Sequence, residues 1–413
     1  MSDSQQHLTQ KKIATIRQSL VKRKRSETRF RAYGVVSILC SLSFLVFLLT
    51  SVIATGVGAF ISSEIELTLR LDKQSHQTSP RSLIRDQLRI EFPDVTSRSE
   101  RRELYRLVSV ESEYILQRKL VEQALSDTSL SVWLPMSDKF NQYRKGSSKV
   151  AMSEQELNWY HSLLEQERIR TTFNWRFFSL GDSRNPEVAG IAGAFMGSLF
   201  TLLTTMLLSF PIGVGAAIYL EEFAPKNTLT DIIEVNINNL AAVPSIVFGL
   251  LGLAIFLNVL ELPRSTPLVG GLVLTLMTLP TIIISSRASL KSVPPSIRDG
   301  ALAMGASRTQ VVFHHVVPLA LPGMFTGTII GMAQALGETA PLLMIGMVAF
   351  IVDVPQGFLD AATALPVQIF LWSENPERGY VELTSAAIIV LLFFLFLMNG
   401  VALYLRRKLE TRW

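Results

Sequence analysis

The chain has 413 residues, 48% of them hydrophobic, and its 39 Lys and Arg against 34 Asp and Glu give a formal net charge of +5. The mean hydropathy is +0.33 although several segments are densely charged, so the apolar residues must be concentrated in runs. This pattern indicates a membrane protein. A single cysteine, Cys40, excludes a disulfide framework and a cysteine metal site, and the five histidines have no ligand spacing, so we expect no bound metal.

Residues 1–33 form a polar arm with the basic run KRKR at residues 22–25. Such a run can bind nucleic acid, but directly before an apolar span it more often anchors the chain on the cytoplasmic side. We therefore expect an anchor that contacts membrane lipid, and no nucleic-acid partner. Residues 34–61 are apolar and long enough to cross a bilayer of ~30 Å, and too long for a typical cleaved signal peptide. They are expected to be a retained first transmembrane helix.

Residues 62–187 change to soluble character, with charges of both signs in balance. Apolar spacing of three and four residues predicts helices over 97–124 and 153–170. Alternating apolar and polar residues favour one short strand, at Ile65, Leu67, Leu69 and Leu71. The many aromatic side chains suffice for a small core, so we predict a mainly helical periplasmic insert.

Five further apolar runs follow, at 191–220, 240–260, 268–286, 319–350 and 383–405. Six spans in all predict an all-α membrane protein, with 188–405 as a five-helix core and 406–413 as a tail. An even number of crossings places both termini in the cytoplasm, where the basic arm and the basic tail belong. The acidic connection 221–239 falls on the same side and receives no support from that rule.

Residues 293–318 join two of these spans through a polar stretch. Ser296 is expected to cap a short helix that Gly305 ends in the left-handed conformation, and Ser307 offers a second cap. One side of this helix has only small residues and a methionine, at Gly300, Ala301, Ala303 and Met304. A partner protein can approach that side closely, or the helix can lie against the chain's own spans.

Asp299-Gly300-Ala301, then Gly305, then Val317-Pro318 resembles the Glu-Ala-Ala…Gly…Ile-x-Leu-Pro loop of ABC importer permeases. In that family the loop is a coupling helix that docks on a separate ATP-binding subunit. This copy has Asp and Gly in place of Glu and the first Ala, and His315 in place of Ile. The resemblance assigns an ATPase-coupling role to Ser296, Asp299, Gly300, Ala301, Gly305 and Pro318.

Longer runs, at 217–256, 268–307 and 337–346, look like those of PstA-type permeases of bacterial phosphate-specific ABC importers. The likeness covers about residues 174–413, and the upstream part is similar to the extended proteobacterial form of that subunit. It implies a type I ABC importer permease in the inner membrane, working by alternating access. It also implies four partners: phosphate, a PstC-type second permease, a PstB-type ATPase dimer and a PstS-type periplasmic binding protein.

No GxxxxGK[ST] loop occurs in the sequence, so ATP and Mg are expected to be used by the partner ATPase. This chain is then not an enzyme and binds no cofactor. Two alternatives remain open at this point. One is a permease for another oxyanion, such as molybdate or sulfate, and the other is a membrane sensor with a periplasmic ligand domain.

Two ionisable residues near the spans are candidates for the substrate pathway. Glu338 lies in an apolar run, where a carboxylate is costly and functional by default. It is expected to orient an arginine or a partner helix or to accept a proton, unless it forms a packing or kink hydrogen bond beside Pro341. Arg287 can bind an oxyanion through paired donors, or it can be an ordinary cytoplasmic anchor. The family often has arginine where Gln334 stands.

Hydroxyl groups near these positions are further candidates, at Thr281, Ser285, Ser286 and Thr339. They can donate hydrogen bonds to phosphate, or to carbonyl groups of their own helices. Pro244-Ser245 and Pro280-Thr281 are expected to break two helices inside the membrane. Broken helices expose amide groups that suit anions, although a simple kink is the alternative.

Overall fold

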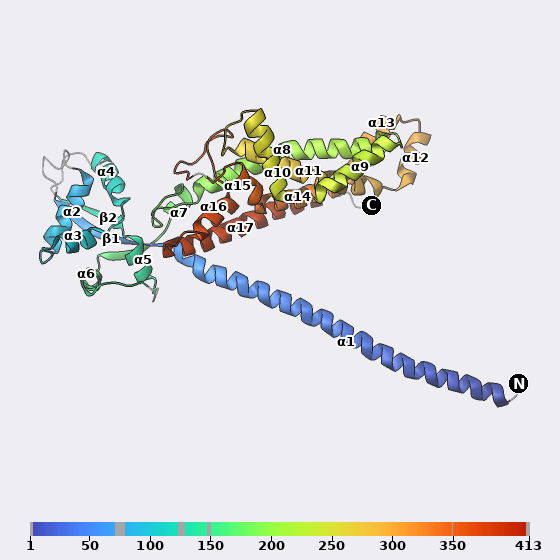
Figure 1. Cartoon of the computed structure of the whole chain (residues 1–413), viewed down its shortest axis with the longest axis horizontal. Coiled ribbons are helices and arrows are strands. Elements are labelled where there is room, and N and C mark those ends of the chain that lie inside the picture. The colour runs from blue at the N-terminus through green and yellow to red at the C-terminus, as the bar shows by residue number, and fades with distance from the viewer. Residues whose placement is uncertain (1–2, 71–78, 123–128, 147–149, 349, 410–413) are drawn as a thin grey trace. The chain divides into compact units, whose positions relative to one another are not determined.

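The computed structural model describes residues 3–70, 79–122, 129–146, 150–348 and 350–409. The chain separates into two units, residues 1–54 and 55–413. The described residues of the first unit belong to one helix, α1 (Asp3–Gly56), so the basic arm and the first apolar run are continuous from Asp3 onward (Figure 1). Lys, Arg, Gln and Leu favour helix, and no proline interrupts the segment. A short 3-10 turn, η1 (Val57–Phe60), ends the apolar run, and Ile61 already begins a strand.

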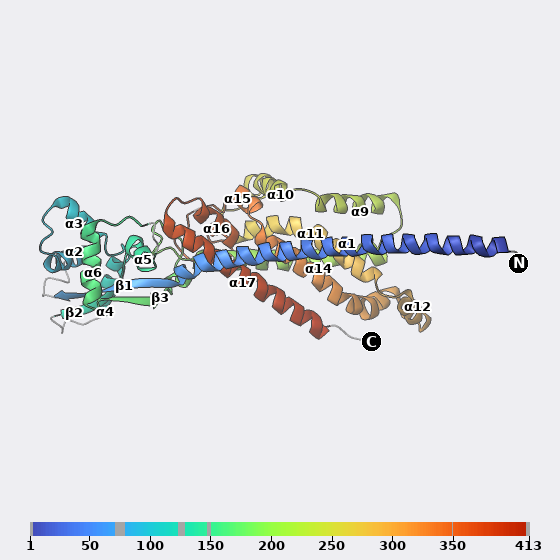
Figure 2. The same cartoon turned by 90° about the horizontal axis from the view of Figure 1, so that it is seen from below.

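A three-stranded antiparallel sheet lies at the centre of the insert, in the order β2-β1-β3. Its strands are β1 (Ile61–Arg70), β2 (Ser129–Pro135) and β3 (Ile169–Phe173), which Figure 2 shows side by side. The predicted strand is confirmed, because Ile65, Leu67 and Leu69 are buried in β1, whereas Leu71 lies outside the described residues. The other two strands were not predicted. Ile61 pairs with Phe173, so the chain enters and leaves the insert at adjacent positions.

Helices surround this sheet, namely α2 (Pro80–Glu91), α3 (Arg98–Tyr105), α4 (Ser112–Glu122), α5 (Asp138–Arg144) and α6 (Glu154–Glu165). The predicted helix over 97–124 is wrong as a single element, because the chain between α3 and α4 leaves the helix to pair Val108 with Met136. The predicted helix over 153–170 is shorter than expected, since its last residues belong to β3. A capping box of Ser153 and Glu156 begins α6.

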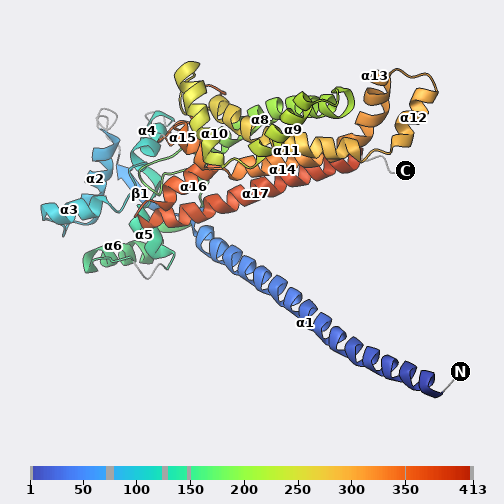
Figure 3. The same cartoon turned by 45° about the vertical axis from the view of Figure 1, so that its right-hand side comes forward.

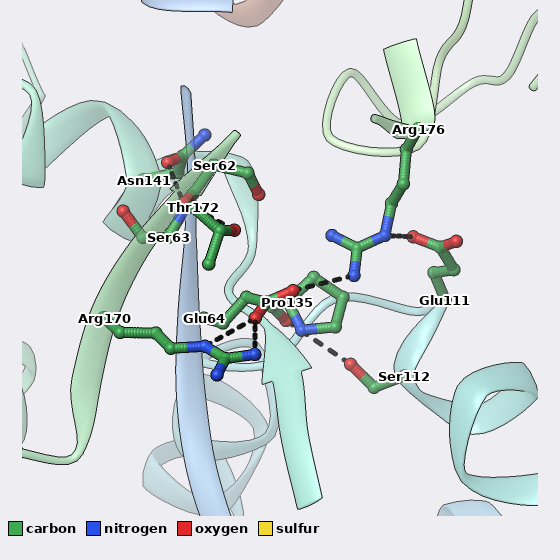
Figure 4. Close-up of polar contacts among 10 residues, drawn as sticks. All are labelled: Ser62, Ser63, Glu64, Glu111, Ser112, Pro135, Asn141, Arg170, Thr172 and Arg176. Carbon is green, nitrogen blue, oxygen red and sulfur yellow. Dashed lines mark hydrogen bonds and ion pairs between the residues drawn. The ribbon is translucent and has the colours of Figure 1, made fainter. Parts of the chain in front are cut away.

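Charged side chains join the sheet to the segment that leads into the membrane core (Figure 4). The buried Glu64 of β1 accepts hydrogen bonds from Arg170 Nε (2.9 Å) and from Arg176 Nη2 (3.1 Å). Arg176 begins the short helix α7 (Arg176–Ser179), and its Nε also lies 3.1 Å from Glu111 Oε2. Burial raises the pKa of Glu111 above its usual value, against the opposing effect of Arg176. These contacts fix α7 to the insert.

The membrane core follows as a series of helices: α8 (Ala192–Ile218), η2 (Tyr219–Phe223), α9 (Thr228–Ala241), α10 (Ser245–Gly252), η3 (Leu253–Val259), α11 (Pro267–Lys291), α12 (Pro295–Ala303), α13 (Arg308–Gln310), η4 (Val311–Val316), α14 (Val317–Gly337), α15 (Ala340–Met344), α16 (Leu365–Ser373) and α17 (Arg378–Leu409). Figures 1 and 3 show α12 at the end of this core that lies away from the insert.

Five helices in the described residues are long and apolar enough to cross a membrane, at 23–60, 192–223, 267–291, 308–337 and 378–404. Among the described residues a sixth crossing is present only if α9 and the helix formed by α10 and η3 (Ser245–Val259) count together as one bent span. The run predicted as a span over 240–260 is not one continuous helix, because the chain turns by 103° at the break before Ser245. The break predicted at Pro244 is confirmed, whereas the one predicted at Pro280 is wrong, because α11 continues through that proline.

Small residues let the core helices approach closely. A Cβ atom added to Gly327 of α14 would lie only 1.7 Å from Ser285 Oγ of α11, and one added to Gly323 would lie 2.3 Å from Ser289 Oγ. These two contacts show that α14 runs antiparallel to α11. Gly249 of α10 likewise lies against Pro341 of α15, where an added Cβ would be 2.7 Å from Cα.

Candidate coupling site and substrate pathway

The stretch resembling a coupling loop forms one short helix, α12, followed by a separate longer one. Gly305 follows α12 with φ of +89°, as predicted. Its N–H donates to Leu302 O (2.9 Å) and the N–H of Ala306 donates to Ala301 O (3.1 Å), which is the bonding pattern of a Schellman motif. Ser307 caps the next helix in a capping box with Gln310, also as predicted. The cap predicted at Ser296 is wrong, because α12 begins at Pro295 without a side-chain cap.

The exposed side of α12 agrees with the predicted one at Gly300, Ala303 and Met304, but not at Ala301. Ala301 is buried in a cluster of the chain's own apolar residues, so it does not face a partner. Leu302 and Met304 are instead 49% and 84% exposed, and the position of a Cβ at Gly300 has no neighbouring atom within 4 Å. The exposed face therefore combines two apolar side chains with an open glycine. Sequence reasoning named Met304 but missed Leu302, although an apolar residue next to Ala303 in a polar loop was a usable signal.

The second half of the loop is continuous with the following span. Residues 308–337 form one helical rod, through α13, η4 and α14, so Pro318 lies within its length rather than in a loop. The π-helical segment η4 contains His315, the residue that departs from the family pattern. The predicted span over 319–350 ends early, because α14 stops at Gly337.

Arg298 connects α12 to two other elements. Its guanidinium donates to Val293 O (2.7 Å) and Leu290 O (2.9 Å) at the end of α11. It also donates to Glu222 Oε1 (2.7 Å) in η2, and both side chains are mostly buried. Arg308 donates to the carbonyl oxygen of Glu222 as well. Glu222 therefore joins the end of α8 to both helices of the loop.

A neighbouring carboxylate forms a second set of ion pairs. Glu221 Oε2 lies 3.4 Å from Arg287 Nε and 3.6 Å from Lys291 Nζ. Arg287 also pairs with Glu234 of α9 through its Nη2 atom. The acidic connection and the basic end of α11, which the sequence placed on one side of the membrane, thus neutralise each other. We call Glu221, Glu222, Glu234, Arg287, Lys291 and Arg298 the coupling network.

Arg287 consequently has a role that neither sequence interpretation contained. Its side chain is 15% exposed and is held by two carboxylates of its own chain. An oxyanion at this guanidinium would have to displace those carboxylates. The geometry therefore places Arg287 in the coupling network rather than at a free anion site.

Glu338 lies in a break between helices. It follows α14 with an extended backbone (φ −80°, ψ 125°), and α15 begins two residues later. No hydrogen bond of its carboxylate is present among the described residues, and the side chain is half-buried. The sequence placed this residue inside a continuous span, so the helix break was missed. Gly337 before it and Pro341 after it were the available signals.

The predicted pathway residues do not come together in one site. Because Ser285 lies against Gly327, Arg287 is level with about residue 325 of α14, some thirteen residues before Glu338. At 1.5 Å per residue, this separates Arg287 from Glu338 by about 20 Å along the helix axes. The two cannot act on one phosphate ion.

The remaining pathway candidates have varied surroundings. Ser285 Oγ donates to Ile282 O of its own helix (3.1 Å). Ser286 is fully buried, and its hydroxyl has no hydrogen-bond partner among the described residues. Gln334 is exposed and Thr339 is half-buried beside the Glu338 break. Only Thr339 and Gln334 thus lie near Glu338 along the chain.

Polar contacts between the insert and the core form a region that sequence reasoning missed. Lys145 Nζ of α5 lies 2.8 Å from Glu382 Oε2 of α17, and both side chains are largely buried. Ser109 Oγ donates to Glu187 Oε1 (3.1 Å), and burial raises the pKa of Glu187. Burial, followed by the charge of Glu187, raises the pKa of Asp138 to about 6. The residues that pair here are far apart in the sequence, so no local sequence pattern predicts their contacts.

Comparison with known proteins decides the family. Residues 209–411 match the family described as Binding-protein-dependent transport system inner membrane component, and residues 17–154 match a Domain of unknown function (DUF3333). The Probable ABC transporter permease protein YqgH of Bacillus subtilis is 32% identical over 251 residues, which are 58% of this chain and 77% of that protein. The chain belongs to the ABC transporter permeases.

Two further relatives agree with this assignment. The Phosphate transport system permease protein PstA of Mycobacterium leprae is 29% identical over 237 residues, covering 57% of this chain and 75% of that protein. The Probable ABC transporter permease protein YqgI of Bacillus subtilis is 34% identical over 170 residues, and the chain spans only 58% of its length. The resemblance to PstA-type permeases is confirmed. This permease is a mainly helical, multi-pass protein of the inner membrane.

Proposed function

We propose that the chain is the transmembrane permease subunit of an ATP-driven importer of inorganic phosphate. The substrate rests on the similarity to PstA, whose name specifies phosphate transport. The observation that carries the permease role is the exposed face of α12, where Leu302 and Met304 project from a helix that Gly305 ends sharply. Apolar side chains exposed at the end of a membrane bundle fit a protein partner.

ATP hydrolysis occurs on a separate subunit in this proposal. A PstB-type ATPase dimer, using ATP and Mg, would receive the α12 face in a groove, as a helix is received in other complexes. Apolar contact then fixes the helix, while Gly300 allows the two backbones to approach. A PstC-type second permease would complete the pathway, and a PstS-type binding protein would deliver phosphate from the periplasm.

The coupling network supports a route from α12 to the spans. When the ATPase pair closes, displacement of α12 pulls on Arg298, and Glu222 passes the displacement to the end of α8. The pairs of Arg287 with Glu221 and Glu234 bring α11 and α9 along as one body. A rigid movement of these helices is the kind of transition that alternating access requires.

The orientation follows from the same proposal. The α12 end of the core is cytoplasmic, together with both termini, and the insert is periplasmic. Basic residues at the cytoplasmic end agree with the positive-inside rule, since Arg298, Lys291 and Arg308 lie there. Cysteine labelling from outside intact cells, with one variant at Val121 of the insert and one at Met304, tests it: only the first should react.

Reconstitution tests the function. The permease, with its second permease and ATPase, is placed in proteoliposomes, and uptake of radiolabelled phosphate is followed with binding protein outside. Uptake should require ATP and the binding protein and should not be competed by molybdate or sulfate. If molybdate or sulfate at equal concentration competes with phosphate, the competing anion is also a substrate, and the proposed selectivity for phosphate is wrong. If the chain purified from membranes carries no ATPase with it, the permease role is wrong.

A further inference from the structure

A polar cavity of about 810 Å³ lies between the insert and the ends of the core segments next to it. Four arginines line it, namely Arg81 and Arg85 of α2, Arg102 of α3 and Arg106, which follows the last residue of α3; we call them the basic wall. Carboxylates also line it, at Glu113, Asp138, Glu187 and Glu377, together with the amine of Lys139. The coupling network and Glu338 do not line this cavity, so nothing proposed above uses it.

The basic wall has a regular origin in sequence. Arginines recur every four residues on α2, at 81, 85 and 89, and again from the start of α3 to its C-cap, at 98, 102 and 106. Residues four apart share one face of a helix, so each row presents its guanidinium groups together. Like charges at this spacing destabilise a helix. Repulsion within the rows is therefore a cost, which partners must offset.

Some of these arginines have partners of their own. Arg81 Nε lies 3.1 Å from Glu113 Oε1, and Arg89 pairs with Asp86 at 3.3 Å. Arg85, Arg102 and Arg106 form no ion pair with a carboxylate in the described part of the chain. Three unneutralised guanidinium groups thus face one cavity.

Stacking fixes the position of one of the three. The guanidinium carbon of Arg85 lies 4.9 Å from the centre of the Tyr105 ring, within the range of a cation–π contact. Arg89 lies 5.6 Å from the same ring centre and donates to the Tyr105 hydroxyl. An arginine held on an aromatic ring keeps its donors directed and ready for a planar or tetrahedral oxyanion.

The lining carboxylates restrict the kind of anion that this cavity can bind. A fully deprotonated anion such as sulfate accepts hydrogen bonds only, so the carboxylates that line the same cavity would repel it. A phosphoryl group that keeps one proton accepts from guanidinium and also donates to a carboxylate. The volume exceeds that of phosphate alone and leaves room for an esterified substituent.

We propose that this cavity is a second, extracytoplasmic binding site for a phosphoryl group, either hydrogen phosphate or a phosphomonoester, held by Arg85, Arg102 and Arg106. The group presents its oxygens to the three arginines and its proton to one of the lining carboxylates, Asp138, Glu187 or Glu377. Because the site lies between the insert and the core, its occupancy reports the external anion to both. Binding at this site goes beyond the proposed transport function, and only its extracytoplasmic placement rests on the orientation proposed above.

Equilibrium dialysis of the full-length chain in lipid nanodiscs, without partner subunits, tests the site. Three radiolabelled probes are compared: orthophosphate, glycerol 3-phosphate and sulfate. Orthophosphate or glycerol 3-phosphate should bind saturably, and the tighter of the two identifies the ligand class. Arg102→Ala and Arg106→Ala should each weaken binding at least about tenfold, which corresponds to the loss of one charge-assisted contact. Arg102→Lys should recover part of it.

Arg98→Ala is the matched control. Arg98 lies in the same helix as Arg102 but does not line the cavity, so its replacement removes the same charge outside the site. It should bind within about twofold of wild type, a change of less than half a kcal/mol. Unchanged binding in Arg102→Ala and Arg106→Ala would move the anion elsewhere and overturn the proposal. Equal binding of sulfate, or no saturable binding of either phosphoryl probe, would overturn it as well.

Discussion

Replacing Arg298 is the sharpest test of the coupling network. Arg298→Ala removes an ion pair of 2.7 Å with Glu222 and two hydrogen bonds, one to a carbonyl group in the last turn of α11 and one to the carbonyl group of Val293 just after it. Hydrogen bonds to a charged group contribute about 1.5–3 kcal/mol each, and breaking a buried pair costs about 3–5 kcal/mol. Because the arginine side chain is 23% exposed, we take about 2–4 kcal/mol as the expected loss of local stability. The α12 helix should then move without carrying α8.

The assay is the number of phosphate ions transported per ATP hydrolysed in proteoliposomes containing the whole importer. Arg298→Ala should retain ATP hydrolysis but lose most uptake, and Arg298→Lys should be intermediate, since lysine keeps the charge but lacks the planar fork. Arg264→Ala, a charge loss at an exposed position outside the network, is the control. A double-mutant cycle with Glu222→Gln should give a coupling energy of about 1–3 kcal/mol. Unchanged stoichiometry in Arg298→Ala would refute the reasoning.

Three further predictions concern single side chains. Gly305→Val should abolish uptake while the protein still inserts in the membrane, because a β-branched residue at φ +89° costs about 1–3 kcal/mol. Gly300→Ala should not destabilise the isolated chain, since an added Cβ meets no atom within 4 Å. Uptake assays and thermal unfolding check both variants, and normal uptake by Gly305→Val would contradict the first prediction. Arg287→Ala should lower the maximal uptake rate with little change in the phosphate concentration for half-maximal uptake; a large rise in that concentration would restore an anion-binding role. Asp138→Asn should unfold at a higher temperature than wild type above about pH 6, and at the same temperature as wild type below about pH 4. Burial raises the pKa of Asp138 to about 6 in the folded state, so ionisation of this carboxyl destabilises the folded wild type as pH rises between those two values. The loss of folding free energy reaches up to about 3 kcal/mol, and the Asp138→Asn variant avoids it. A constant difference across that pH range would exclude the burial of this carboxyl as the cause.

Features that depend on neighbouring residues could be predicted from the sequence. Gly305 ends α12 because a left-handed residue is needed there, and Ser307 begins the next helix with a side-chain cap. The apolar runs located five of the six predicted crossings because a bilayer demands long helices with few charges. The strand around Ile65 was found from its alternation alone.

Features that depend on distant residues could not be predicted in this way. Arg287 and Glu221 are 66 positions apart, so their pairing appears in the sequence only as one basic and one acidic segment. Strand β3 follows an amphipathic helix without a turn signal, and its pairing with β1 decides its conformation. Ala301 was assigned to the docking face of α12 with its small neighbours, although it packs on distant residues of the chain's own core, because composition does not tell which residues of a helix are buried.

The insert gives the last prediction, because α8 connects it to the coupling network. Arg176 fixes the segment before α8 to the sheet, and Glu222 lies just beyond the other end of that 27-residue helix, about 40 Å away. Replacing residues 62–172 by a short Gly/Ser turn is feasible, since Ile61 and Phe173 are paired neighbours about 5 Å apart in the sheet. The shortened permease should keep some ATP-dependent uptake, as the core helices remain complete, but it should respond less to limiting binding protein. If it assembles with its ATPase and shows no uptake at any binding-protein concentration, the insert is part of the pathway itself, and α8 must be driven from both of its ends.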